Sequence, residues 1–93
     1  MLILIAYDIP SDKRRAKVAK LLEGFGSRVQ YSVFECDLTD RQMRELHGKL
    51  QRRLRTAEGD SVRIYRLCAA CAQRVEVIGA GPLPARQADV III

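Results

Sequence analysis

The sequence predicts an α+β fold of ferredoxin-like type, a small antiparallel sheet with two helices in the order β-α-β-β-α-β. Three observations support this fold class: an apolar run at Leu2–Tyr7, amphipathic stretches at 11–24 and 39–55, and β-branched stretches between and after them. A chain of 93 residues is long enough for one small domain. We place this domain at residues 1–80 and an additional tail at 81–93.

The first strand and the first helix follow each other directly. A short run rich in Ile and Leu that is closed by Pro10 is typical of a buried strand. Ser11 is a suitable N-cap for the helix that follows, and Gly24 and Gly26 end it. This helix carries an apolar stripe at helical spacing, formed by Val18, Leu21, Leu22 and Phe25.

The stretch Arg28–Leu38 is rich in β-branched and aromatic residues and is predicted to be a strand. The ferredoxin-like order requires two strands at this point. We therefore expect a short strand, a bend near Gln30–Tyr31 and a longer strand within 26–38, although the pattern itself does not mark the bend. Thr39 with Gln42 predicts a capping box for the second helix. The buried stripe of this helix is Met43, Leu46, Leu50 and Leu54.

Two strands are predicted after the second helix, one at 62–67 and one at Arg74–Ile78. Cys68 and Cys71 lie in the link between them, which we interpret as a turn. Half of a zinc knuckle is the alternative, but a structural zinc site needs four ligands and the sequence has one histidine. The apolar β-branched run Val90–Ile93 predicts an extra C-terminal strand.

Positive charge is concentrated in the predicted helices. The whole chain has a net charge of +5, whereas the segments 11–24 and 39–55 hold eleven of the sixteen Lys and Arg and four acidic residues, a net charge of +7. Two basic helices on one face of a sheet suit a phosphate backbone. The candidate phosphate-binding residues are Lys13, Arg14, Arg15, Lys17, Arg52, Arg53 and Arg55.

The second face of the sheet is also expected to be covered. Both alternating sets of residues in Leu2–Tyr7 are apolar, whereas the helices cover only one face. A second copy of the chain is the simplest cover, and a symmetric dimer would bring two copies of Asp8 towards each other. Two carboxylates are sufficient to hold Mg²⁺, which activates water in phosphodiester hydrolysis. The alternative is that Asp8 only accepts hydrogen bonds from the turn backbone.

Targeting and membrane signals are absent from the sequence. The first apolar run has no basic region before it and no small-residue cleavage site after it, and no segment approaches the roughly 18 apolar residues of a membrane span. We therefore expect a cytoplasmic protein with reduced thiols and no membrane partner. A Ser/His/Asp set, a Walker loop and a dinucleotide-binding glycine motif are also absent.

Several motifs together resemble a known family. They are Tyr7–Ile9 after the apolar strand, Asp12–Arg15 at the helix start, Arg28–Glu35, Ser61–Tyr65, and the Cys-x-x-Cys link. This set, which spans essentially the whole chain, resembles the small CRISPR-associated endonuclease of spacer acquisition, the Cas2 family. The Arg28–Glu35 stretch at this spacing is its most specific part.

The resemblance implies a ferredoxin-like homodimer with facing sheets, in which each terminal strand adds to the partner's sheet. It implies an Mg²⁺-dependent endonuclease of single-stranded RNA or double-stranded DNA in spacer acquisition and antiviral defence, associated with the CRISPR spacer integrase. By position, Asp8 would bind the metal, and Tyr7, Arg15, Arg28 and Phe34 would support the site or bind the substrate. Lys17 stands where some members carry Arg, which keeps the charge but loses the guanidinium fork.

Two other functions are compatible with the sequence. A non-catalytic dimeric DNA-binding adaptor of the spacer integrase needs the basic helices but does not need Asp8. A ferredoxin-like regulatory dimer that binds a small anion is the other alternative. The charge of two whole helices argues against it, since a small ligand needs only one pocket.

Overall fold

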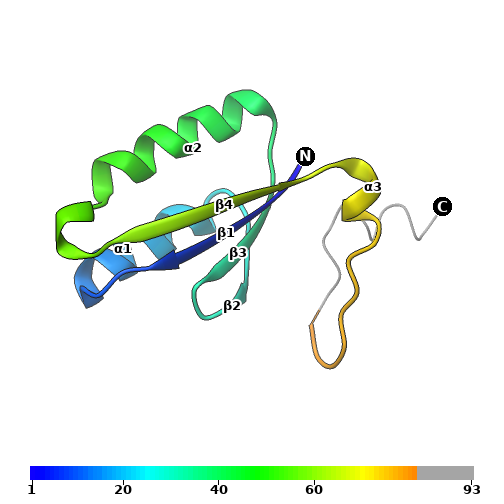
Figure 1. Cartoon of the computed structure of the whole chain (residues 1–93), viewed down its shortest axis with the longest axis horizontal. Helices are drawn as coiled ribbons and strands as arrows, with labels where there is room; N and C mark the ends of the chain where they lie inside the picture. Colours follow the sequence, from blue (N-terminus) through cyan, green and yellow to red (C-terminus); the bar gives the residue numbers. More distant parts are fainter. Residues whose placement is uncertain (82–93) are drawn as a thin grey trace.

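The computed structural model describes residues 1–81 and has the expected alternation of strands and helices (Figure 1). Its elements are β1 (Leu2–Asp8), α1 (Asp12–Glu23), β2 (Ser27–Gln30), β3 (Val33–Asp37), α2 (Asp40–Arg53), the short 3-10 helix η1 (Thr56–Glu58), β4 (Ser61–Leu67) and α3 (Ala69–Ala72). The predicted α+β class and β-α-β-β-α-β order are confirmed.

Strand β1 lies in the interior of a four-stranded antiparallel sheet with the order β2-β3-β1-β4. It pairs with β3 from Leu2, opposite Asp37, to Ala6, opposite Val33. On its other side it pairs with β4 along its whole length, which places Asp8 opposite Ser61. The last residue of β1 therefore lies beside the first residue of β4, at one end of the sheet.

The expected bend between the two middle strands is confirmed at Tyr31 and Ser32. Strand β2 pairs with β3 with a register shift between Arg28 and Gln30. Gly26 makes the approach to β2 possible, because a Cβ at this position would collide with the backbone oxygen of Glu35 and with the Cys36 sulfur. Only a residue without a side chain lets the backbone lie this close to β3.

The predicted helix caps are confirmed. Ser11 Oγ accepts a hydrogen bond from the backbone N–H of Arg14 at 3.2 Å. Thr39 and Gln42 form the capping box, in which each side chain accepts a hydrogen bond from the backbone N–H of the other residue. These caps satisfy amide donors that the first turn of a helix leaves without partners.

The hydrophobic core lies between one face of the sheet and the two long helices. Alternate residues of β1, namely Ile3, Ile5 and Tyr7, belong to one buried cluster with side chains of β3, α1 and α2. The contributions of those three elements include Phe34, Cys36, Val18, Leu22, Leu46 and Leu50. Both helices therefore cover the same face, as the charge argument required.

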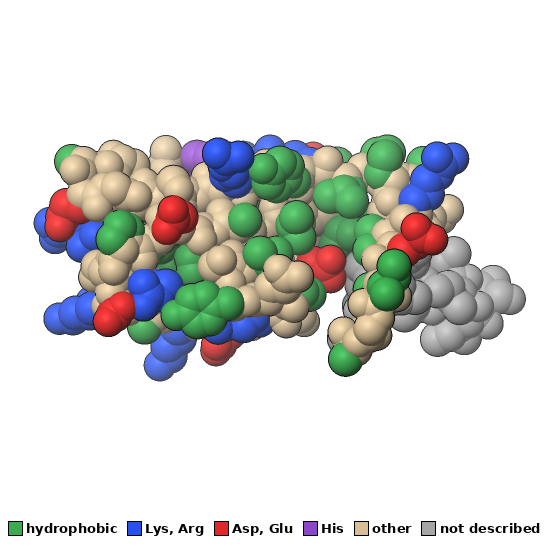
Figure 2. All heavy atoms as spheres, turned by 60° about the horizontal axis from the view of Figure 1, so that its bottom comes forward, with side chains coloured by type: hydrophobic (Ala, Val, Ile, Leu, Met, Phe, Trp, Pro, Cys, Tyr) green, Lys and Arg blue, Asp and Glu red, His purple; other side chains and the backbone are tan. Residues whose placement is uncertain are grey.

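The opposite face of the sheet is referred to below as the open face. Strand alternation places Leu4, Ala6 and Asp8 of β1 on it, where Leu4 lies between Glu35 of β3 and Tyr65 of β4. Within residues 1–81, Leu4 and Ala6 are only half-buried and Tyr65 is exposed. Figure 2 shows hydrophobic side chains gathered in the middle of one face of the molecule, with charged side chains around them.

The prediction of a strand at Arg74–Ile78 is wrong for the described chain. After β4 the backbone forms the single helical turn α3, and residues 75–78 have no regular secondary structure. A β-branched sequence forms a strand only where a neighbouring strand accepts its backbone hydrogen bonds, and α3 intervenes between β4 and this stretch. The predicted strand Val90–Ile93 lies outside the described residues.

Among residues 1–81, no helix combines the length and the apolar composition that a membrane crossing would need.

Candidate nucleic-acid and metal site

Asp8 ends β1 on the open face and is exposed to solvent. Its backbone pairs with Ser61 of β4. Its carboxylate forms no hydrogen bond or ion pair with any residue in 1–81. The alternative in which Asp8 only caps the following turn therefore has no supporting contact in the described chain. An exposed carboxylate whose oxygens have no protein partner can accept a cation.

Tyr7 precedes Asp8 and lies on the other side of the sheet. Its ring is buried in the core, with its centroid 6.4 Å from that of Phe34. Its hydroxyl donates to the backbone oxygen of Tyr31 at 3.4 Å, which ties β1 to the turn between β2 and β3. Tyr7 therefore positions the surrounding backbone.

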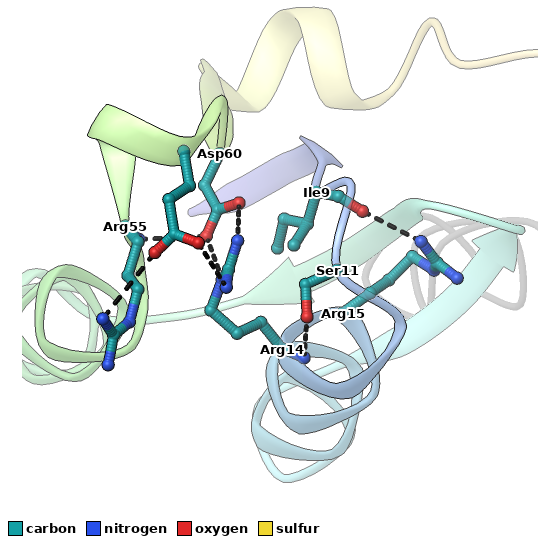
Figure 3. Close-up of polar contacts among 7 residues, drawn as sticks. Ile9, Ser11, Arg14, Arg15, Arg55 and Asp60 are labelled. Atoms are coloured by element: carbon teal, nitrogen blue, oxygen red, sulfur yellow. Dashed lines mark hydrogen bonds and ion pairs between the residues drawn. The ribbon is translucent and has the colours of Figure 1, made fainter.

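Arg15 projects from α1 and is held by two oxygen acceptors. Nη1 donates to the backbone oxygen of Ile9 at 2.9 Å (Figure 3), and Nη2 forms an ion pair with Asp12. The hydrogen bond to Asp12 raises the pKa of Arg15. Its central carbon lies 6.0 Å from the centre of the Tyr31 ring. The side chain is thus fixed at the carboxyl end of β1 while part of it faces solvent.

A hollow of about 180 Å³ lies between α1 and the start of the β2–β3 hairpin. Its polar and aromatic lining comes from Tyr7, Asp12, Arg15, Arg28 and Tyr31. The two arginines give it positive character, and Tyr31 is 70% exposed at its rim. Guanidinium groups beside an exposed aromatic ring suit a nucleotide, since they offer donors to phosphate and a surface for stacking.

Phe34 belongs to the fully buried core, with an exposed fraction of 0%. The central guanidinium carbon of Arg28 lies 5.3 Å from the centre of its ring, within the range of a cation–π contact. Phe34 therefore cannot touch a substrate directly. Its position beneath Arg28 suits a supporting role.

The structure thus divides the predicted catalytic residues into two groups. Tyr7, Arg15 and Phe34 lie on the helix side of the sheet, together with Arg28. Asp8 lies on the open face. Successive residues of a strand point to opposite faces, so adjacent Tyr7 and Asp8 cannot share one pocket within a single chain.

Arg14, a predicted phosphate-binding residue, is partly exposed and forms an ion pair with a buried carboxylate (Figure 3). Its Nε and Nη2 donate to the two carboxylate oxygens of Asp60 at 2.8 and 3.0 Å. The backbone N–H of Arg55 also donates to Asp60, at 2.9 Å. The hydrogen bond from Arg14 is the main cause that lowers the pKa of Asp60. Arg14 is therefore the least available cation of α1.

The remaining predicted cations are exposed. Lys13 and Lys17 on α1, and Arg52 on α2, form no ion pair within the described part of the chain. Arg53 donates to the backbone oxygen of Lys49 at 3.2 Å, and Arg55 lies 3.7 Å from Glu58. Contacts at such exposed positions are weak and leave a cation able to bind phosphate.

Sequence analysis missed two features of the site. The sequence did not single out Asp60, whose side chain is fully buried. A second hollow of about 330 Å³ lies between α2 and β4 and is lined by Arg44, His47 and Arg66 together with Asp40 and Met43. The spacing of Asp40, Arg44 and His47 on one helical face is visible in the sequence, but the proximity of Arg66 is not.

The first 75 residues of the chain match the family model described as CRISPR associated protein Cas2. The chain belongs to the Cas2 family. The relative named CRISPR-associated endoribonuclease Cas2 1, from Chloroflexus aurantiacus, is 55% identical over 93 residues, which cover 100% of both chains. The predicted family is confirmed.

Solved structures of Cas2 proteins have the same fold. The crystal structure of Streptococcus pyogenes Cas2 at pH 6.5 superimposes with a TM-score of 0.73 at 36% identity, covering 85% of this chain and 100% of that one. A chain of a partial Cas6-RT-Cas1–Cas2 complex gives a TM-score of 0.71 at 34% identity, covering 83% and 89%. The predicted membership of a CRISPR-associated nuclease family is thus supported by both sequence and fold.

Proposed function

We propose that this Cas2 chain is an Mg²⁺-dependent endoribonuclease that works as a homodimer, with Asp8 as the metal ligand. The observation that carries the proposal is the exposed Asp8 carboxylate, which has no protein partner in residues 1–81. The name of the relative from Chloroflexus aurantiacus supports RNA as the substrate. We place this activity in the cytoplasm, where RNA and foreign DNA are both accessible.

One chain offers few side chains that could bind a metal ion at this site. Residues 1–81 contain no group of three or more His, Cys, Asp or Glu side chains that could hold a metal ion. This fits Mg²⁺, which is commonly bound by one or two carboxylates together with waters and phosphate oxygens. Two Asp8 carboxylates across a two-fold axis would meet that requirement. The chemistry supplied by bound Mg²⁺ is activation of water and neutralisation of charge on the phosphate.

The chain's own cations and aromatic rings would hold the nucleic acid. Arg15 and Arg28 would donate to phosphate oxygens at the hollow beside α1. Tyr31 would stack on a base at its rim. Lys13 and Lys17 would extend the contact along α1, while buried Tyr7 and Phe34 keep the strand end and Arg28 in place.

The open face supports a homodimer. Within residues 1–81 this face presents the half-buried Leu4 and Ala6 and the exposed Tyr65. A second copy packed on it would remove this apolar surface from water and bring two Asp8 residues to one interface. Exchange of the tail 81–93 with the partner would add a strand to each sheet.

The test compares wild type, Asp8→Asn and Asp37→Asn on labelled RNA and duplex DNA, with Mg²⁺ and with EDTA. Asp37 is a matched control, because it is an exposed carboxylate that ends β3 at the opposite end of the sheet. We expect Asp8→Asn to lose at least about 100-fold in cleavage rate, which corresponds to about 2.7 kcal/mol of transition-state stabilisation. Dimer mass and melting temperature should be unchanged.

Cleavage by Asp8→Asn at the wild-type rate would overturn the metal-ligand role of Asp8. Equal losses in Asp8→Asn and Asp37→Asn would show that the loss follows from disturbed folding at either end of the sheet. Wild type that binds nucleic acid but cleaves none with any divalent metal would exclude the nuclease proposal.

A non-catalytic adaptor of the spacer integrase is the second candidate function. The similarity to a chain of a Cas1–Cas2 complex favours it, as do the exposed cations of α1 and α2. In this case duplex DNA and a Cas1 integrase would bind wild type and Asp8→Asn equally well. Co-sedimentation with the integrase and duplex DNA tests it, and failure of both variants to form the complex would exclude it.

A further inference from the structure

The short link after β4 carries two exposed cysteines, Cys68 and Cys71. We propose that they form a redox-active dithiol that closes reversibly to an intramolecular disulfide by exchange with a small-molecule disulfide such as oxidised glutathione. The inference does not depend on the proposed nuclease function, because it concerns a different part of the chain.

The backbone of α3 brings the two side chains together. Cys68 is the N-cap of this turn, and the backbone N–H of Ala72 donates to the Cys68 oxygen at 2.9 Å, which closes one helical turn over the intervening residues. Side chains three positions apart on a helical turn have Cβ atoms roughly 5–6 Å apart. A disulfide needs a Cβ separation of about 3.5–4.5 Å, so closing the bond draws the two Cβ atoms together by roughly 1–2 Å.

One residue of α3 packs against the protein, and the two cysteines face solvent. Ala72, the last residue of α3, is buried, whereas Cys68, Ala69, Ala70 and Cys71 are all exposed. A dissolved disulfide can therefore reach both sulfurs without unfolding the chain.

The two thiols also differ from each other in acidity. The backbone N–H of Cys71, and then its thiol, lower the pKa of Cys68. The side-chain hydrogen bond with Cys68 raises the pKa of Cys71. Because the thiolate is the attacking species, Cys68 is the nucleophile of the pair and Cys71 is the thiol that resolves the mixed disulfide.

A structural metal site at this link is less consistent with the structure. Closed zinc sites use four ligands, and residues 1–81 offer no third His, Cys, Asp or Glu side chain beside these two cysteines. Cys36, the remaining thiol, is buried in the core, and burial raises its pKa to about 11. It serves as an internal control that should not react.

Oxidised glutathione is the oxidant in this exchange, and it supplies the electron balance of the reaction. The Cys68 thiolate attacks one sulfur of oxidised glutathione, which forms a Cys68–glutathione mixed disulfide and releases the first glutathione. Cys71 loses its proton and attacks the Cys68 sulfur, which forms the Cys68–Cys71 bond and releases the second glutathione. The protein dithiol loses two electrons and two protons. The two glutathione molecules that are released carry these electrons and protons.

The experiment treats the full chain with oxidised glutathione in the presence of EDTA, followed by acid quenching and mass spectrometry of the intact protein and its peptides. We expect wild type to lose two hydrogen atoms, with the bond mapped to Cys68 and Cys71, and to regain them in reduced glutathione. Cys71→Ser should stop at a glutathione adduct on Cys68. Cys68→Ser should react at least about tenfold more slowly.

Cys36→Ser is the matched control and should close the bond as wild type does. Two results would overturn the proposal. In one, wild type accumulates independent adducts on Cys68 and Cys71 without closing a bond. In the other, neither thiol of the folded protein reacts, although both react after denaturation in urea.

Discussion

The guanidinium of Arg14 donates to both carboxylate oxygens of Asp60, and this pair joins the first turn of α1 to the start of β4. The two residues are 46 positions apart in the chain. Glu58 adds a contact of 3.5 Å to the same guanidinium. The contact therefore fixes the amino-terminal end of α1, which carries Lys13, Arg15 and Lys17, relative to the sheet.

Asp60→Asn should lower the melting temperature by several degrees at pH 7, since it leaves Arg14 without its carboxylate partner. Because the folded-state pKa of Asp60 is lowered, its stabilising effect is present above the ordinary carboxyl pKa near about 4 and is lost as pH falls through the lowered value. Thermal unfolding followed by circular dichroism across pH 7 to 2 should therefore show the difference from wild type shrinking in acid.

Asp12→Asn is the matched control for this prediction, because Asp12 forms an ion pair with Arg15 on the same helix but is 92% exposed. Its melting temperature should stay close to that of wild type. Similar losses in both variants would contradict a special role for the Asp60 pair.

Gly26→Ala should destabilise the fold by about 1–3 kcal/mol, the usual cost of forcing an extra group into a filled space. The added methyl group would collide with the backbone of Glu35, which cannot move without disturbing the β2–β3 pairing. Equilibrium unfolding in urea measures the effect. Gly24→Ala is the control, since its methyl group would meet only the Leu21 oxygen at 3.4 Å and its φ of −76° suits alanine. Equal stability of the two variants would rule out the predicted collision.

Replacing Lys13 and Lys17 together by Glu should weaken duplex DNA binding for all sequences. Each lost phosphate contact should reduce the slope of log affinity against log salt by about one. The triple replacement of Arg52, Arg53 and Arg55 by Glu should act in the same direction from α2. Fluorescence anisotropy at several salt concentrations provides the measurement.

Arg74→Glu, an exposed charge change outside both long helices, is the control for the DNA experiment. If it has the same effect as the helix variants, binding follows total charge and not the basic helices. A salt slope near one for wild type, together with tight binding of inorganic phosphate, would favour the small-anion alternative.

Deleting residues 85–93 should shift the protein from dimer towards monomer or aggregate in light scattering. The reason is that an apolar β-branched run at the end of the chain is expected to pair with the sheet edge of the partner. A well-behaved dimer after the deletion would exclude strand exchange as the basis of dimerisation, while contact through the open faces would remain possible.

Local patterns predicted the parts of the fold that depend on local physics. The caps at Ser11 and Thr39 and the apolar stripes of both helices follow from spacing within one or two turns. The prediction of a strand at Arg74–Ile78 was wrong because a strand needs a neighbouring strand to pair with, and sequence periodicity does not reveal that neighbour. The ion pair of Arg14 with Asp60 was missed for a similar reason, since it joins two elements that are distant in the chain.

The sequence named the residues of the candidate site but not how they are divided between the two faces of the sheet. The residues Tyr7 and Asp8 of β1 show why. Tyr7 and Asp8 are adjacent in the motif that carries the family resemblance, which suggested one shared site. Strand alternation assigns them to opposite faces, so Asp8 lies on the open face, whereas Tyr7 lines the hollow beside α1.

The half-buried Leu4 and Ala6 of the open face have a consequence for how stability must be measured. When a second copy covers this face, unfolding and dissociation become one bimolecular equilibrium, and the midpoint of thermal unfolding rises with protein concentration. A variant's melting temperature then reports the concentration of the sample as well as the substitution, so comparisons between variants are meaningful only at equal protomer concentration.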